Sequence, residues 1–174
     1  IMKETNFDYN HTIGIRASTT FGIGNWMNGS VSATGIYRHD KSSDFFDLPF
    51  NRKHISAILA GNLSAQLSRS HHIHFILNPF YQSKAIQGLY DIKSVFLLNA
   101  MLRWASDNEK WSIVVKSSNT FNEGFSTKSV HGNQDYHMSI KQDWASASIS
   151  IICKIGKYKE KRIKDVDTSR MGVN

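Results

Sequence analysis

The stretch HISAILAGNLSAQL, from His54 to Leu67, differs in character between its odd and even positions. The odd positions hold Ile55, Ala57, Leu59, Gly61, Leu63, Ala65 and Leu67. The even positions are mostly polar and hold His54, Ser56, Ile58, Ala60, Asn62, Ser64 and Gln66. Because successive side chains of a strand point to opposite faces of a sheet, the stretch predicts a strand with one dry face and one wet face. The dry face contacts either a protein core or lipid.

Six further stretches alternate in the same way, and no helical period of comparable length occurs. They are residues 11–21, 27–40, 72–82, 91–104, 111–121 and 145–155. Short connections (22–25, 68–71 and 105–110) alternate along the chain with long ones (41–52, 83–90 and 122–142). We therefore expect an all-β chain, an antiparallel up-and-down meander of about seven or eight long strands. Outer-membrane barrels have short turns at one rim and long loops at the other, so we expect part of a transmembrane β-barrel.

Strand length and aromatic placement favour lipid over a protein core. The stretches run for about eleven to fourteen residues, whereas strands of globular proteins usually have about five or six. Large aromatic residues lie toward the strand ends. Phe21, Trp26, Trp104 and Trp111 lie beside the short turns, and Tyr37, Tyr81, Tyr90 and Trp144 lie toward the long loops. Two such girdles are typical of membrane interfaces, so we expect the apolar face to contact outer-membrane lipid, with a soluble sheet as the alternative.

Composition narrows the classes of protein to which the chain could belong. No run of eighteen apolar residues exists among the 174, so no transmembrane helix is expected. The single Cys153 forms no internal disulfide. Much of the net charge of +7 comes from KIGKYKEKRIK, residues 154–164, and the rest is only mildly basic, so no nucleic-acid partner is expected. The opening IMKETNFDYN has no apolar signal-peptide core, and the chain starts at Ile1, so we expect a piece of a longer protein.

Three segments resemble the carboxyl-terminal end of TonB-dependent outer-membrane receptors, specifically the outer membrane protein β-barrel family. They are QGLYDIKSVFLLNAMLRW, with Gly88, Tyr90, Asp91 and Ser94 at the entry to a descending strand; SNTFN, with Asn119 and Asn122 after an ascending strand; and VDTSRMG, with Ser169 and Arg170 closing a basic tail. One departure is that the family usually ends its last strand on an aromatic residue, whereas this chain has Ile155 before Gly156.

The resemblance implies a wide barrel of about 22 strands with a plugged lumen, opened by a TonB-type energy-coupling protein of the inner membrane. Residues 1–156 would be the carboxyl-terminal portion of the barrel and residues 157–174 a basic tail. The implied partners are outer-membrane lipid, the rest of the parent barrel and its plug domain. Because single-chain barrels close with an even number of strands, seven strands indicate either an eight-stranded barrel or part of a larger one.

The candidate binding residues are few. His72 and His74 share one strand face at a spacing that can bind a metal, and His54 on the neighbouring strand is a possible third ligand; polar histidines near the periplasmic rim, His71 among them, are the simpler interpretation. Asp44, Asp47 and Asp91 are candidates for calcium binding or acid–base work. Phe45, Phe46 and Phe50 are candidates for stacking on a ligand or on neighbouring loops.

No Gly-rich phosphate loop, Ser-His-Asp spacing or Cys-based metal box occurs, so neither an enzyme nor a cofactor is expected. The first functional interpretation is a fragment of an outer-membrane receptor that imports a nutrient across the bacterial outer membrane. The alternatives are a small complete outer-membrane barrel with a structural or adhesive role and a soluble β-sheet binding module. A plug domain upstream would support the first, and a signal peptide directly before Ile1 would support the small barrel.

Overall fold

The structure is a computed structural model, and it describes residues 8–43, 49–70, 72–108, 110–121, 125–131, 134–140 and 145–155. Eleven strands and no helix are found within these ranges. No helix among the described residues is long and apolar enough to cross a membrane. The expectation of an all-β antiparallel meander is confirmed.

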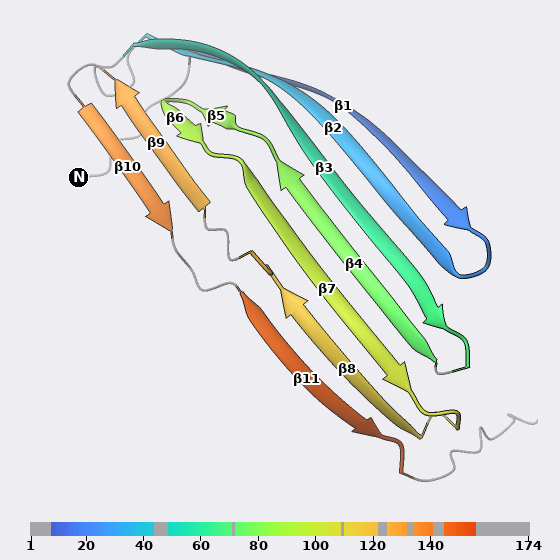
Figure 1. The fold of residues 1–174 in the computed structure, drawn as a ribbon. Coiled ribbons are helices and arrows are strands. Elements are labelled where there is room, and N and C mark those ends of the chain that lie inside the picture. The colour runs from blue at the N-terminus through green and yellow to red at the C-terminus, as the bar shows by residue number, and fades with distance from the viewer. Residues whose placement is uncertain are drawn as a thin grey trace, which may run out of the picture.

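Seven strands form one antiparallel sheet that follows the order of the chain (Figure 1). They are β1 (Tyr9–Ile23), β2 (Met27–Ser42), β3 (Phe50–Ser68), β4 (Ile73–Gln82), β7 (Val95–Ala105), β8 (Trp111–Ser118) and β11 (Ser146–Cys153). These correspond to the seven strands predicted from the alternation. β1 and β11 are the two outermost strands, on opposite borders of a long, bent sheet.

The ends of the strands follow from local backbone chemistry. The turn between β1 and β2 contains Gly24 at a φ of 54°, a left-handed conformation that costs glycine little. The turn between β3 and β4 places His72 in the same region, at a φ of 47°. Asn119 has a φ of 46° directly after β8, so this strand ends at Ser118 rather than at residue 121 as expected. Asparagine is enriched at such positions because its short polar side chain tolerates them.

A second, smaller sheet lies at the long-loop end of the molecule, with the strand order β10-β9-β6-β5 (Figure 1). Its strands are β5 (Ala85–Gln87), β6 (Tyr90–Ile92), β9 (Phe125–His131) and β10 (Gln134–Ile140). The prediction of plain loops at residues 83–90 and 122–142 was therefore wrong. The predicted strand 91–104 is also divided, because β6 belongs to the second sheet and β7 to the first.

The cross-strand registers of the large sheet separate two kinds of row. One row is apolar from edge to edge: Ile23, Met27, Ala65, Phe75, Leu102, Val115 and Ile149. A row on the other face is polar and includes Thr20, Ser30 and Asn62. Asn62 donates a hydrogen bond to Asn78, which lies opposite Asn99 on β7. One face of the sheet is therefore apolar over all seven strands.

The polar face needs one correction. Several large apolar side chains lie on it over β3, β4 and β7, where a mostly polar face with few large apolar groups was expected: Ile58, Ile76, Phe80, Val95, Leu97 and Met101. They are half-buried, and Phe80 pairs directly with Leu97. We call these six residues the inner apolar patch.

The described residues form almost no core of their own. Among the described residues only six apolar side chains are buried: Phe50, Ala65, Ile86, Leu89, Ala105 and Val114. The two most deeply buried side chains are polar, Asp40 and Ser42. A soluble sheet of this size would cover one of its faces, because the hydrophobic effect is the main favourable term in folding. Here the apolar face stays open.

Candidate functional site

The apolar face of the large sheet is the first candidate surface. Three of its isoleucines are so exposed that contact with water would be unfavourable. Ile15 is 78% exposed, Ile55 74% and Ile149 72%. These residues lie on β1, β3 and β11, so the exposure extends from one edge of the sheet to the other. A contiguous apolar surface of this extent marks an interaction with lipid or with another apolar surface.

A recess interrupts this face over β1, β2, β3 and β4. It has a volume of about 460 Å³. Small residues on three neighbouring strands make its floor, with Leu59 and Tyr81 beside them: Ala17, Ala33 and Gly61. The registers place Ala17, Ala33 and Leu59 in one row, so the recess belongs to the apolar face.

Aromatic residues flank the apolar face, with two departures from the predicted girdles. Trp26, Trp104 and Trp111 are exposed at the short-turn end, as expected. At the other end Tyr37 lies opposite Ile55 and Tyr81 opposite Leu59, so the two tyrosines stand at different levels of β3. Tyr90 lies in the second sheet, where its ring packs edge-to-face against Tyr136 at 6.2 Å. Trp144 lies outside the described residues.

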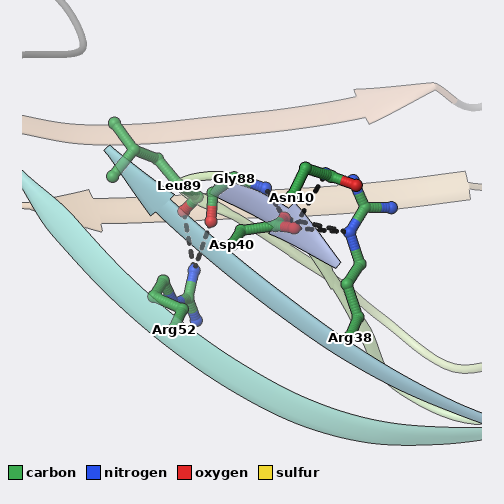
Figure 2. A network of polar contacts seen from close by, with 6 residues as sticks. All are labelled: Asn10, Arg38, Asp40, Arg52, Gly88 and Leu89. Carbon is green, nitrogen blue, oxygen red and sulfur yellow. Dashed lines mark hydrogen bonds and ion pairs between the residues drawn. The ribbon is translucent and has the colours of Figure 1, made fainter. Parts of the chain in front are cut away.

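A network of polar contacts at the long-loop end is centred on Asp40 of β2 (Figure 2). Arg38 Nε donates to both carboxylate oxygens of Asp40, at 3.0 and 2.9 Å, and Asn10 Nδ2 donates to Oδ1 at 2.9 Å. The backbone N–H of Gly88 donates to Oδ2 at 2.8 Å. The Asp40 side chain is fully buried, and a buried carboxylate is stable only with donors of this kind around it.

Arg52 of β3 makes the second half of this network (Figure 2). Its Nη1 donates to the carbonyl oxygens of Gly88, at 3.4 Å, and Leu89, at 3.0 Å. Its Nη2 forms an ion pair with Asp91. Gly88 adopts a φ of 57°, which lets the β5–β6 turn present its N–H to Asp40 and its carbonyl to Arg52. Two strands of the large sheet thus hold this turn by its backbone.

The network shows on which side of the sheet the β5–β6 hairpin lies. Arg38 and Asp40 are two residues apart on β2, so they share a face, and the register pairs Asp40 with Arg52. This is the polar face, on which His54 also lies, opposite Arg38. The hairpin therefore folds over the polar face and leaves the apolar face uncovered.

A pocket of about 480 Å³ opens beside the hairpin. Three lysines, Lys84, Lys93 and Lys128, line it, together with His54, Asp91 and Ser94, and its apolar wall consists of Ala85, Ile86 and Ile92. His54 Nε2 donates to the carbonyl oxygen of Lys84 at 2.8 Å. The N–H of Lys93 donates to the carbonyl oxygen of Ser126 at 3.0 Å. We call this the loop-end pocket.

The three predicted metal ligands do not come together. His54 lies in the loop-end pocket, while His74 lies beside Gln66 near the other end of β3. The twelve residue steps of strand from His54 to Gln66 correspond to about 40 Å. His72 Nε2 is 4.0 Å from Asp107 Oδ1 in the short-turn region. Across the ranges that the structure describes, no three His, Cys, Asp or Glu side chains form a group that could hold a metal ion.

Only two of the other predicted binding residues, Phe50 and Asp91, are among the residues that the structure describes. His71, Asp44, Asp47, Phe45 and Phe46 lie outside the described residues. Phe50 is buried, with 6% exposed, at the loop end of β3, so it offers little ring surface to a ligand. Asp91 pairs with Arg52 rather than with another carboxylate.

The lysines of the loop-end pocket were not identified from the sequence. Lys84 and Lys93 flank the hairpin, whereas Lys128 lies on β9, and the pairing of β6 with β9 places Lys128 opposite Asp91. Lys128 lies far from Lys84 and Lys93 along the sequence, and no local motif contains all three. The available signal was weak: Lys84 and Lys128 lie in the two connections predicted to be long, and Lys93 lies at the start of the predicted strand 91–104.

Comparison with known proteins adds one finding. The model of a family described as the outer membrane protein beta-barrel family matches residues 1–155. No curated protein and no solved structure gives a significant match.

Proposed function

The chain belongs to the outer membrane protein β-barrel family and is a protein of the bacterial outer membrane, and from this premise we propose that it forms part of a TonB-dependent receptor that takes up a nutrient. We propose lipid of that membrane, rather than a protein core, as the contact of its apolar face, the choice raised by His54 to Leu67. The soluble interpretation is not retained.

The observation that carries the proposal is the openness of the large sheet (Figure 1). β1 and β11 lie on opposite borders of the sheet, with the five other strands between them. In an eight-stranded barrel a single further strand would join these two edges. Among the described strands β1 and β11 do not pair with each other, so the sheet is open, as expected for part of a larger barrel. The widest barrels in this membrane are transporters with a plugged lumen.

The inner apolar patch supports a plug. Ile58, Phe80 and Leu97 lie on the face that would line the lumen, where contact with bulk water is unfavourable. A plug domain packed on this part of the wall would cover them. We propose the plug domain and the rest of the parent barrel as partners of this chain, and an energy-coupling protein as a partner of the whole receptor. The proposal assigns no catalytic reaction to the chain.

A small complete barrel is the second candidate. The same inner apolar patch favours it, because the interior of a barrel with about eight strands is filled by side chains. Such a barrel would have a structural or adhesive role and would need no coupling protein. The first candidate requires a parent barrel, a plug domain and a coupling protein, whereas the second requires none of them.

Formaldehyde cross-linking in living cells tests the transport proposal on the intact parent protein. We expect an adduct between the parent and a TonB-type coupling protein, absent from a strain without the coupling protein. The coding sequence upstream should also encode a plug domain. If no adduct forms and a signal peptide directly precedes this chain, the transport proposal is wrong and the small barrel is supported.

A further inference from the structure

We propose that the loop-end pocket binds a small organic anion with two or more carboxylate or phosphate groups. The inference rests on the proposed receptor function, since it names the chemical class of ligand that the receptor would take. It starts from the charges that line the pocket, from its shape and from its position on the polar face.

The charges in the pocket are unbalanced. Lys84, Lys93 and Lys128 all line it and are all exposed. Within the described ranges, none of the three makes an ion pair with a carboxylate. The one carboxylate of the lining, Asp91, pairs with Arg52 and is thereby neutralised. A concave site with one sign of charge concentrates the field and attracts ions of the opposite sign.

Contacts with the backbone hold in place the segments that carry the three cations. His54 donates from Nε2 to the carbonyl oxygen of Lys84, and Lys93 donates from its N–H to Ser126. The β6–β9 pairing sets the place of Lys128. The ammonium groups are therefore attached to ordered segments around one cavity, and this arrangement reduces the entropy that a bound anion would cost.

The shape of the pocket selects an organic anion over a simple ion. Its volume of about 480 Å³ is in the range of small-molecule sites, about 300–1,000 Å³. Ala85, Ile86 and Ile92 supply an apolar wall opposite the polar groups. Several ammonium groups around one such cavity match a ligand that carries several anionic groups on a carbon frame.

The position of the pocket excludes a lipid headgroup as the source of the anion. His54, which lines the pocket, lies on the polar face of β3, and the apolar face is the one that contacts lipid. The ligand is therefore a solute that enters from the long-loop end. That end faces the exterior in barrels of this layout.

Calorimetric titration of the intact parent protein in detergent, with citrate and 2,3-bisphosphoglycerate as probes, tests the proposal. We expect at least one probe to bind to the wild type, and binding to weaken as salt is raised. The triple variant K84Q/K93Q/K128Q should raise the Kd about tenfold or more, because charge-assisted hydrogen bonds are lost. The charge-preserving K84R/K93R/K128R should keep binding within about threefold of the wild type.

The matched control is K41Q/K53Q/K110Q, which removes three exposed lysines that do not line the pocket. Heat-modifiable gel mobility verifies that each variant is folded. The proposal is overturned if neither probe binds, or if the pocket and control variants bind equally well. Binding without a cross-link to a coupling protein would retain the pocket and reject transport, and a cross-link without binding would do the reverse.

Discussion

Leu59 and Asn62 lie three residues apart on β3 and face different surroundings. Leu59 is 47% exposed on the apolar face, between Ala33 and Tyr81. Asn62 lies on the polar face and donates to Asn78. A guanidinium at the membrane midplane must lose its water or draw water in, whereas on the lumen side it stays hydrated.

We predict that Leu59→Arg lowers the stability of the intact barrel by about 2–4 kcal/mol, and that Asn62→Arg costs far less. Urea unfolding of the parent protein in lipid vesicles measures both. Equal losses for the two variants would contradict the assignment of the faces.

A soluble core would also reject Leu59→Arg, so a second measurement is needed. Cys153 is first replaced by serine, and a single cysteine that carries a fluorophore is then placed at position 59, 62 or 63 of the parent in liposomes. Brominated lipid should quench the label at Leu59 and Leu63 and leave it unquenched at Asn62. Absence of quenching at both leucines would exclude lipid contact.

At the scale of elements, the β5–β6 hairpin depends on one buried carboxylate. Asp40 accepts hydrogen bonds from Arg38, Asn10 and the N–H of Gly88, and its side chain has no exposed surface. Removal of the carboxylate leaves the buried N–H of Gly88 and the partly exposed Arg38 without their acceptor. Such losses cost about 3–5 kcal/mol when a buried pair is broken.

We predict that Asp40→Ala destabilises the parent protein by about 3 kcal/mol and releases the hairpin. Limited trypsin digestion detects the release, because Lys84 and Lys93 flank the hairpin. The control is Asp91→Ala, which removes the exposed partner of Arg52 and should cost less than about 1 kcal/mol. Equal digestion of the wild type and Asp40→Ala would contradict this role of Asp40.

The strands of the large sheet could be predicted because each has a long alternating pattern, as in His54 to Leu67. β5 and β6 have only three residues each, which is too short for a period to be recognised. β9, FSTKSVH, and β10, QDYHMSI, are polar on both faces of the strand, so they show no dry face. The inner apolar patch was missed for the opposite reason, since Ile76 and Phe80 lie among other apolar residues of β4.

The functional surfaces divide in the same way. The apolar face follows from the alternation, which identified its residues from the sequence, and strand length and aromatic placement then predicted that this face contacts lipid. The loop-end pocket depends on the β6–β9 pairing, which brings Lys128 to the hairpin, and no pattern in the sequence encodes that contact. The assignment of residues 157–174 as a separate basic tail stays a prediction.

The dimensions of the whole sheet fit a bilayer. The ten residue steps from Ile55 to Ala65 on β3 span about 33 Å along the strand. At a strand tilt of about 40° this length corresponds to a height of about 25 Å, the height of the apolar band of outer-membrane barrels. The rows that contain these two residues are therefore the two borders expected for the lipid-facing surface.

We predict that the 174-residue chain by itself does not form a closed monomeric barrel. Among the described strands, β1 and β11 each pair on one side only, and lipid cannot satisfy an open strand edge. Refolding of the chain into detergent, followed by gel electrophoresis with and without heating, measures closure. A compact monomer with heat-modifiable mobility would contradict the prediction, whereas oligomers or aggregates would agree with it.

The hydrogen bond from the N–H of Gly88 to Asp40 also makes the opening of the hairpin measurable by hydrogen exchange. This amide is buried against a carboxylate with no exposed surface, so it can exchange with deuterium only when the hairpin lifts from β2. Where the hairpin recloses faster than the open amide exchanges, the protection of this amide gives the free energy of opening of the wall of the loop-end pocket. An anion that binds only the closed arrangement should slow this one amide in proportion to its occupancy. Hydrogen exchange at the amide of Gly88 thus reports ligand binding in the loop-end pocket.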